Sequence, residues 1–147
     1  GAAAALPGPA AASADAFVGP GRFCGYSAII DLQAGERIEA REGGIHGGSF
    51  RWVGGFGNLD VRNIGWASKP PGSEDGLTQA GQTKFNERKD RRRFVIAIWN
   101  RRNGAAYFLS RKAFTDEQRR AIERVDLFEE GDPVPKDCKF RTIFVWE

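Results

Sequence analysis

The chain has 147 residues, of which 41% are hydrophobic, and a formal net charge of +3 at pH 7. This length suffices for one domain with its own core but is short for two, and no apolar run approaches the roughly 20 residues of a membrane-spanning helix. Neither a P-loop nor a strand-linked G-x-G-x-x-G motif is present, which disfavours enzymes that cradle phosphates in a glycine-rich loop.

The first residues have the character of the end of a secretory signal peptide. Residues 1–14 read GAAAALPGPAAASA, with small apolar residues, a Pro-Gly-Pro break and an Ala-Ser-Ala cleavage box ahead of Asp15. We therefore expect a leader over residues 1–14 and a single exported α+β domain over residues 15–147. Its expected location is the periplasm or the medium outside the cell.

Alternating apolar residues predict β-strands along most of the chain. The predicted strands are 23–32, 36–42, 49–53, 59–66, 93–99, 105–112 and 139–146. A change of phase within 59–66 predicts a β-bulge near Asn63. Apolar residues on both faces of 93–99 predict a central, covered strand, and Asn103-Gly104 predicts the hairpin turn that follows it.

One helix is predicted, from Thr115 to about Leu127. Thr115 and Gln118 form a capping-box pattern, and an apolar stripe includes Ile122 and Val125. The fold class is therefore α+β: a mainly antiparallel sheet of about seven strands, with one C-terminal helix before the last strand. The pattern leaves open whether the sheet closes into a barrel-like form.

The two cysteines, Cys24 and Cys138, lie in the first and the last predicted strand regions. An even count in an exported chain favours a disulfide between them, and two buried free thiols are the alternative. Two distant cysteines and one histidine supply too few ligands for a metal site. We expect neither a metal nor a cofactor.

His46 is the only histidine and lies in a glycine-rich segment, so any histidine-based acid–base catalysis must use it. A small secreted hydrolase could cleave RNA with Glu39 as the base, His46 as the acid and Arg51 bound to the phosphate. This reaction requires that the strands that carry these residues pair. The alternative is an exposed loop histidine without a catalytic role.

A basic segment between residues 84 and 102 offers a second kind of site. Its central residues Arg88, Arg91, Arg92 and Arg93 are candidates for binding a polyanion such as nucleic acid, lipopolysaccharide or an acidic glycan. The alternative is a solvated sheet edge whose charges block edge-to-edge pairing.

Aromatic residues mix with glycines in the segment 52–58, where Trp52 and Phe56 are candidates for contacting a partner. The alternative places Trp52 in the core, because it alternates in phase with Phe50. Glycine-rich loops on a braced sheet favour a binding domain for another envelope or secreted protein, such as an inhibitor or an accessory subunit. A hydrolase using His46 and a polyanion-binding protein remain the alternatives.

Overall fold

The computed structural model describes residues 16–25, 28–43, 48–65, 84–99, 105–127, 133 and 135–141. The predicted leader, residues 1–14, lies outside the described residues. The described elements are β1 (Ala16–Val18), β2 (Gly21–Gly25), β3 (Ala28–Leu32), β4 (Arg37–Gly43), β5 (Gly48–Gly54), β6 (Gly57–Gly65), β7 (Lys84–Asp90), β8 (Arg93–Trp99), β9 (Ala105–Ser110), α2 (Asp116–Glu123), β10 (Asp126–Leu127) and β11 (Phe140–Arg141).

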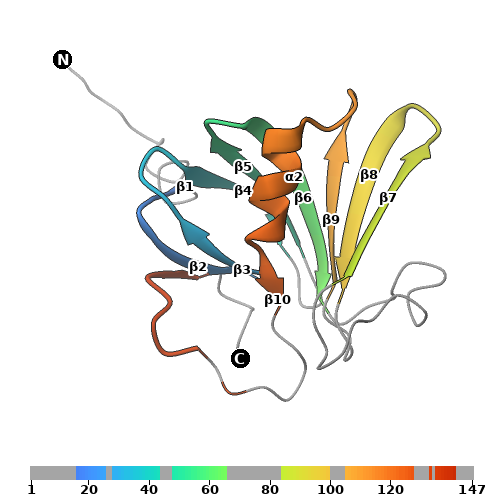
Figure 1. Ribbon diagram of the computed structural model, residues 1–147. Coiled ribbons are helices and arrows are strands. Elements are labelled where there is room, and N and C mark those ends of the chain that lie inside the picture. The colour runs from blue at the N-terminus through green and yellow to red at the C-terminus, as the bar shows by residue number, and fades with distance from the viewer. Residues whose placement is uncertain are drawn as a thin grey trace.

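These strands form two sheets. A seven-stranded antiparallel sheet has the order β1-β4-β5-β6-β9-β8-β7, and a four-stranded sheet has the order β10-β3-β2-β11. Within the described residues β1 and β7 are the edges of the larger sheet. Helix α2 and the smaller sheet lie on the same side of it (Figure 1). The predicted α+β class is confirmed. Among the described residues, no helix has the length and apolar character of a membrane span.

The core lies between the inner face of the larger sheet and these covering elements. Its largest fully buried side chains include Trp52, Phe50 and Phe108 from the larger sheet and Phe23 from the smaller one. The rings of Phe23 and Phe50 meet edge to face with centroids 5.2 Å apart, which joins the two sheets directly. Burying each such side chain stabilises the fold by about 1.5–3 kcal/mol.

The strand predicted over residues 93–99 is β8, and it is covered on both faces as expected. Ile96 and Ile98 join the main core, whereas Ala97 and Trp99 belong to a second buried cluster. Its place in the sheet differs from the prediction, because β8 is next to the edge strand β7 rather than central. The sequence KFNERKD of β7 lacks apolar alternation, so no strand was expected there.

The strand predicted over residues 23–32 is in fact two strands. β2 and β3 form an antiparallel pair in which Phe23 lies opposite Ile30, and both side chains are fully buried. The prediction was wrong because the alternation was followed through the reversal of the chain between β2 and β3. The reversal shifts the phase, so that Phe23 shares a face with Ile30, whereas in one continuous strand the two would lie on opposite faces.

The predicted start of the helix is confirmed, but its predicted end is not. The Thr115 hydroxyl accepts a hydrogen bond from the Gln118 N–H at 3.1 Å, and the Gln118 side chain accepts one from the Thr115 N–H at 3.0 Å. The helix ends at Glu123, because the chain then continues into β10, which pairs with β3. Val125 is still buried in the core, from a position outside the helix.

Two further sequence predictions concern strand pairing, and both are confirmed. The β6–β9 ladder shifts register between Asn63 and Gly65, where the bulge was expected. β8 and β9 pair antiparallel, as a hairpin requires. The predicted turn residues Asn103 and Gly104 lie outside the described residues.

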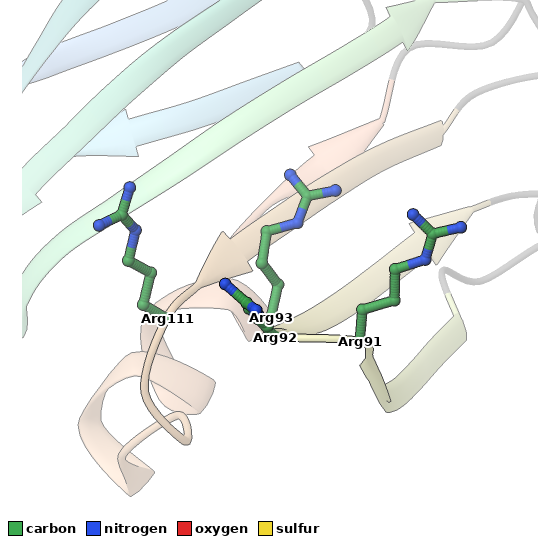
Figure 2. A pocket seen from close by; sticks show the side chains of 4 residues that line it. All are labelled: Arg91, Arg92, Arg93 and Arg111. Atoms are coloured by element: carbon green, nitrogen blue, oxygen red, sulfur yellow. The ribbon is translucent and has the colours of Figure 1, made fainter.

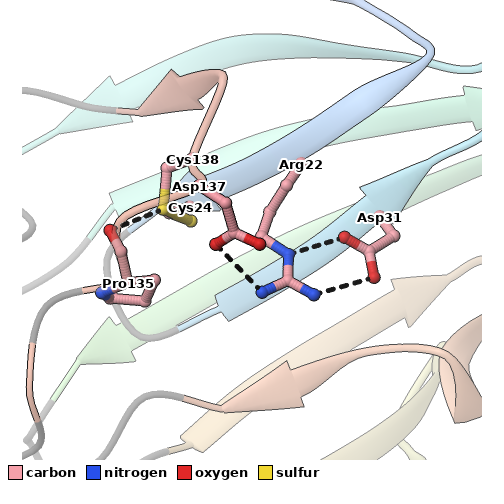
Figure 3. The surroundings of a disulfide bond; sticks show 6 residues. All are labelled: Arg22, Cys24, Asp31, Pro135, Asp137 and Cys138. Carbon is pink, nitrogen blue, oxygen red and sulfur yellow. Dashed lines mark hydrogen bonds and ion pairs between the residues drawn. A yellow bond between two sulfur atoms is a disulfide. The ribbon is translucent and has the colours of Figure 1, made fainter.

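The predicted disulfide is also confirmed: Cys24 in β2 is bonded to Cys138, with their Cα atoms 5.9 Å apart (Figure 3). The cysteines are separated by 114 positions in the chain, and closing a loop of this length stabilises by about 4–5 kcal/mol in the chain-entropy model. The Sγ of Cys138 lies 3.6 Å from the Pro135 carbonyl oxygen. Since a disulfide sulfur carries no hydrogen, this is a close approach and not a donated bond.

An ion cluster reinforces the same junction. The Arg22 guanidinium donates to both carboxylate oxygens of Asp31, at 2.7 and 3.1 Å, and to Asp137 at 3.2 Å. Asp31 belongs to β3 and Asp137 precedes Cys138, so Arg22 joins the β2–β3 hairpin to the segment that carries the second cysteine (Figure 3). The Lys139 N–H donates to the Arg22 carbonyl oxygen at 2.9 Å.

A second ion pair, largely buried, joins the end of α2 to both sheets. The Arg124 guanidinium donates to the two carboxylate oxygens of Glu36, each at 2.8 Å, and to the Asp31 carbonyl oxygen at 2.8 Å. Its Cζ lies 5.4 Å from the centroid of the Trp52 ring. The Glu36 residue is only 6% exposed, so its charge depends on these partners.

The pKa of the Glu36 carboxyl reflects this environment. Burial alone would raise that pKa, but hydrogen bonds from Arg124 and from the Gln33 N–H outweigh burial and hold it below its ordinary value. The Nε1 of Trp52 is buried and makes no hydrogen bond within the described residues. The nearby indole is the smallest of the influences that lower the pKa of Glu36.

We predict that Glu36→Gln lowers the free energy of unfolding by about 2–4 kcal/mol, because it leaves the Arg124 charge without its counter-ion. The loss is moderate because 27% of the Arg124 side chain is exposed. A lowered pKa stabilises the fold above about pH 4.5, the ordinary value for glutamate, and this stabilisation is lost as the pH falls through the lowered pKa.

The measurement is urea denaturation of both proteins between pH 7 and pH 3, and the difference between them should shrink toward the acid end. Glu39→Gln serves as the control, because its carboxylate pairs with Arg37 at the surface and such pairs contribute about 0–1 kcal/mol. Equal losses for the two variants at pH 7 would contradict the role given to Glu36.

Candidate functional site

Four arginine side chains line one cleft of about 790 Å³ at an end of the larger sheet. They are Arg91, Arg92, Arg93 and Arg111. The side chains of Arg91, Arg93 and Arg111 extend to the same side of the strands that carry them (Figure 2). We call this site the arginine cleft.

Strand register brings these residues together. The β7–β8 ladder closes with the pair Asp90 and Arg93, which leaves Arg91 and Arg92 as the two residues of the hairpin turn. On the other side of β8, the ladder with β9 ends at the pair Phe94 and Ser110. The next residue outward is Arg93 on β8 and Arg111 directly after β9. These two arginines therefore lie on neighbouring strands at the same level.

The chain turns away directly after β9. The Ser110 hydroxyl accepts a hydrogen bond from the Lys112 N–H at 3.1 Å, two residues along the chain, a local bond typical of turns. Arg111 stands between these two residues. The turn therefore holds Arg111 at the end of the sheet before the chain enters helix α2.

The arginine cleft lacks counter-ions within the described part of the chain. None of its four guanidinium groups forms an ion pair there, whereas Arg51 pairs with Asp60 at 3.1 Å and Arg37 with Glu39 at 2.9 Å elsewhere on the larger sheet. The positive charge is therefore concentrated at one end of the sheet. Such a concentration raises the local density of anions and steers them to the surface.

A bridge between α2 and β7 holds the hairpin against the rest of the domain. The Arg119 guanidinium donates to both carboxylate oxygens of Glu87, each at 2.8 Å, and to Asp116 at 3.0 Å. The hydrogen bonds from Arg119 hold the pKa of Glu87 below its ordinary value. Because Arg111 belongs to the loop that leads into α2, this bridge ties together the two segments that form the cleft.

The backbone of the hairpin turn is under strain. Arg91 has φ of 59°, in the left-handed region, and it is the one described residue other than glycine with positive φ. This conformation favours glycine, and holding another residue in it costs about 1 kcal/mol or more. An arginine at this position therefore lowers the stability of the turn while adding a charge to the cleft.

The other sequence candidates are placed differently. Arg88 is exposed on β7 opposite Val95, but it does not line the cleft. Trp52 is 0% exposed and its ring packs edge to face on Phe56, at a centroid distance of 4.9 Å. This placement favours the core interpretation of Trp52, whereas a partner contact through the half-buried Phe56 stays a prediction.

The residues of the hydrolase hypothesis are only partly described. Glu39 and Arg51 lie directly opposite each other on β4 and β5, which is the strand pairing that the hypothesis required. Their side chains bond to other partners, Arg37 and Asp60 respectively. His46 lies outside the described residues, so its role stays a prediction. The described residues contain no cluster of three or more His, Cys, Asp or Glu side chains that could hold a metal ion.

Arg111 is the one residue of the cleft that sequence reasoning missed. It is distant in the sequence from the basic hairpin, and only the strand register places it beside Arg93. A useful signal was available, because the predicted hairpin between 93–99 and 105–112 brings the start of the first strand next to the end of the second.

The chain matches no protein-family model, and no curated protein and no solved structure of significant similarity was found for it.

We predict that Arg91→Gly raises the free energy of unfolding by about 0.5–1 kcal/mol relative to Arg91→Ala, because glycine adopts positive φ without steric cost. Both variants lose the same charge, so the comparison isolates the backbone. Chemical denaturation of the two variants side by side measures the difference, and equal stabilities would show that the turn is not strained.

Proposed function

We propose that this protein binds a polyanionic ligand through the arginine cleft. The observation that carries the proposal is that four arginines, with no counter-ion among the described residues, line one hollow of about 790 Å³. Guanidinium groups offer paired N–H donors that match phosphate, sulfate and carboxylate oxygens. A bound polyanion would supply the missing negative charge.

The placement of the charges supports binding over a merely solvated edge. Lysine and arginine on an edge strand are sufficient to block edge-to-edge pairing, and the exposed Arg88 and Lys89 on β7 meet that need. Arg91 and Arg111 lie beyond the ends of the strands, where edge protection gives no reason for an arginine. At Arg91 the charge is present despite the strain of a left-handed backbone.

We propose further that binding takes place outside the cytoplasm, in the periplasm or after secretion. The Cys24–Cys138 disulfide supports an oxidising compartment, and the signal-peptide character of residues 1–14 agrees with it. The ligand would then be an anionic component of the envelope or of the surroundings. Such ligands include an acidic surface of another envelope or secreted protein.

We predict that the double variant Arg93→Ala/Arg111→Ala elutes from immobilised heparin at clearly lower salt than the wild type. Because each phosphate or sulfate contact releases counter-ions, the slope of log K against log salt for a heparin oligosaccharide should fall by about two, one for each arginine. Affinity in low salt should fall by about tenfold or more.

The matched control is Arg41→Ala/Arg120→Ala, which removes the same charge from exposed positions on β4 and α2 that do not line the cleft. This control should retain most of the affinity, since it changes net charge alone. The proposal fails if both double variants lose affinity equally, because binding would then follow net charge and not the cleft.

A second prediction concerns the bridge that ties the hairpin to α2. Glu87→Gln removes a negative charge, so electrostatics alone would strengthen the binding of an anion. We expect weaker binding of the heparin oligosaccharide by a few-fold instead, because the neutral amide leaves Arg119 one acceptor oxygen and no counter-ion on β7, so the hairpin turn is held less firmly against the segment that carries Arg111.

Glu117→Gln is the control for this test, because Glu117 is an exposed carboxylate of α2 without an ion pair among the described residues. It changes net charge by the same amount and should leave the affinity unchanged or slightly higher. Tighter binding by Glu87→Gln as well as by Glu117→Gln would show that the bridge does not position the cleft.

A further inference from the structure

We infer that the arginine cleft recognises a group with two neighbouring phosphates, in preference to carboxylates of the same charge. This inference rests on the proposed function and narrows it to one chemical class of ligand. It follows from the separate backbone positions that carry the guanidinium groups, from their number, and from the absence of ion pairs to them among the described residues.

The guanidinium groups come from three different backbone positions. Arg91 and Arg92 form the hairpin turn, Arg93 opens β8, and Arg111 follows β9 on the neighbouring strand. In Figure 2 the side chains of Arg91, Arg93 and Arg111 reach the same side from separate starting points. These guanidinium groups therefore stand side by side, so one anion with several oxygens can contact more than one of them.

A tetrahedral oxyanion suits this arrangement better than a planar one. A carboxylate has two oxygens in one plane and accepts a single side-on guanidinium fork. Two neighbouring phosphates offer several oxygens that point in different directions, so guanidinium groups from separate backbone positions can each bond to one of them. Arginines that stand side by side thus favour phosphate chemistry.

The number of charges indicates how many phosphates the cleft holds. A phosphate monoester carries about −1.5 to −2 at pH 7, so two neighbouring phosphates come close to balancing four guanidinium groups. Toward β5 and β4, Arg51 and Arg37 are already paired with Asp60 and Glu39. The four guanidinium groups that line the cleft remain for an anion, and two neighbouring phosphates would nearly neutralise them.

Two sources supply this chemistry, namely a free or polymeric phosphate and a phosphorylated headgroup at a lipid surface. Both present adjacent phosphate oxygens to the cleft. The residues of the cleft would bind adjacent phosphates from either source, and vesicle flotation separates the two.

The test is isothermal titration of the full, oxidised chain with tripolyphosphate and, at the same pH and ionic strength, with butanetetracarboxylate, a carboxylate whose charge is close to that of tripolyphosphate. We expect tripolyphosphate to bind at least about tenfold more tightly than the tetracarboxylate, the difference made by one or two added charge-assisted hydrogen bonds. Equal affinities would overturn the inference.

Charge-conserving variants supply the second arm. Arg93→Lys/Arg111→Lys keeps the charge of the cleft but removes the paired donors, so it should lose more affinity for tripolyphosphate than for the tetracarboxylate and with it most of the preference. Arg41→Lys/Arg120→Lys, outside the cleft, should retain the preference. If the cleft variant discriminates as well as the wild type, guanidinium geometry plays no part and the inference is wrong.

The outcomes separate this inference from the proposed function. Heparin binding that depends on Arg93 and Arg111 but is not displaced by tripolyphosphate would leave the proposed function standing and reject the phosphate class. Failure to bind either heparin or tripolyphosphate would reject both. Flotation with vesicles of phosphatidylcholine and phosphatidic acid distinguishes the two sources of phosphate. If the protein floats with the vesicles and tripolyphosphate displaces it, the site belongs to lipid headgroups. If the protein binds tripolyphosphate but does not float, the site belongs to free or polymeric phosphate.

Discussion

The constraint on which the rest of this structure depends is that the seven-stranded sheet buries one of its faces. Helix α2 and the four-stranded sheet cover that face, and Phe23, Phe50 and Phe108 fill the space between them. The Glu36–Arg124 pair fixes the end of the helix at the same junction. The other face is also buried around the smaller cluster of Ala97, Trp99 and Ala105, so charged side chains are left with the remainder of that face and the ends of the strands.

The arginine cleft is a product of that arrangement. Strands β7, β8 and β9 are adjacent and antiparallel, so the turn between β7 and β8 and the end of β9 occur at the same edge of the sheet. The ladders that stabilise the sheet thereby also bring Arg93 and Arg111 together. The costs are repulsion between like charges and a left-handed arginine at Arg91, and the fold tolerates both because its core lies elsewhere.

Much of this architecture could be predicted from local patterns, and the remainder depends on long-range pairing. The capping box at Thr115, the bulge after Asn63 and the Cys24–Cys138 bridge each have a signature within a few residues or in residue identity. The division into two sheets has none, because it depends on which strands pair, and alternation marks only the buried side of each strand. β7 forms because β8 offers it hydrogen bonds, not because its own residues favour a strand, and Arg111 enters the cleft only through register.

The Cys24–Cys138 bond also determines what happens to the chain if it is cut. It closes a covalent ring that runs from β2 to the segment before β11 and includes the hairpin with the arginine cleft. A protease that cleaves once inside this ring opens the loop but releases no fragment, because both pieces stay joined through the sulfur atoms. Loss of material requires a second cut or reduction of the bond, so a nicked molecule still holds all its strands in one covalent unit.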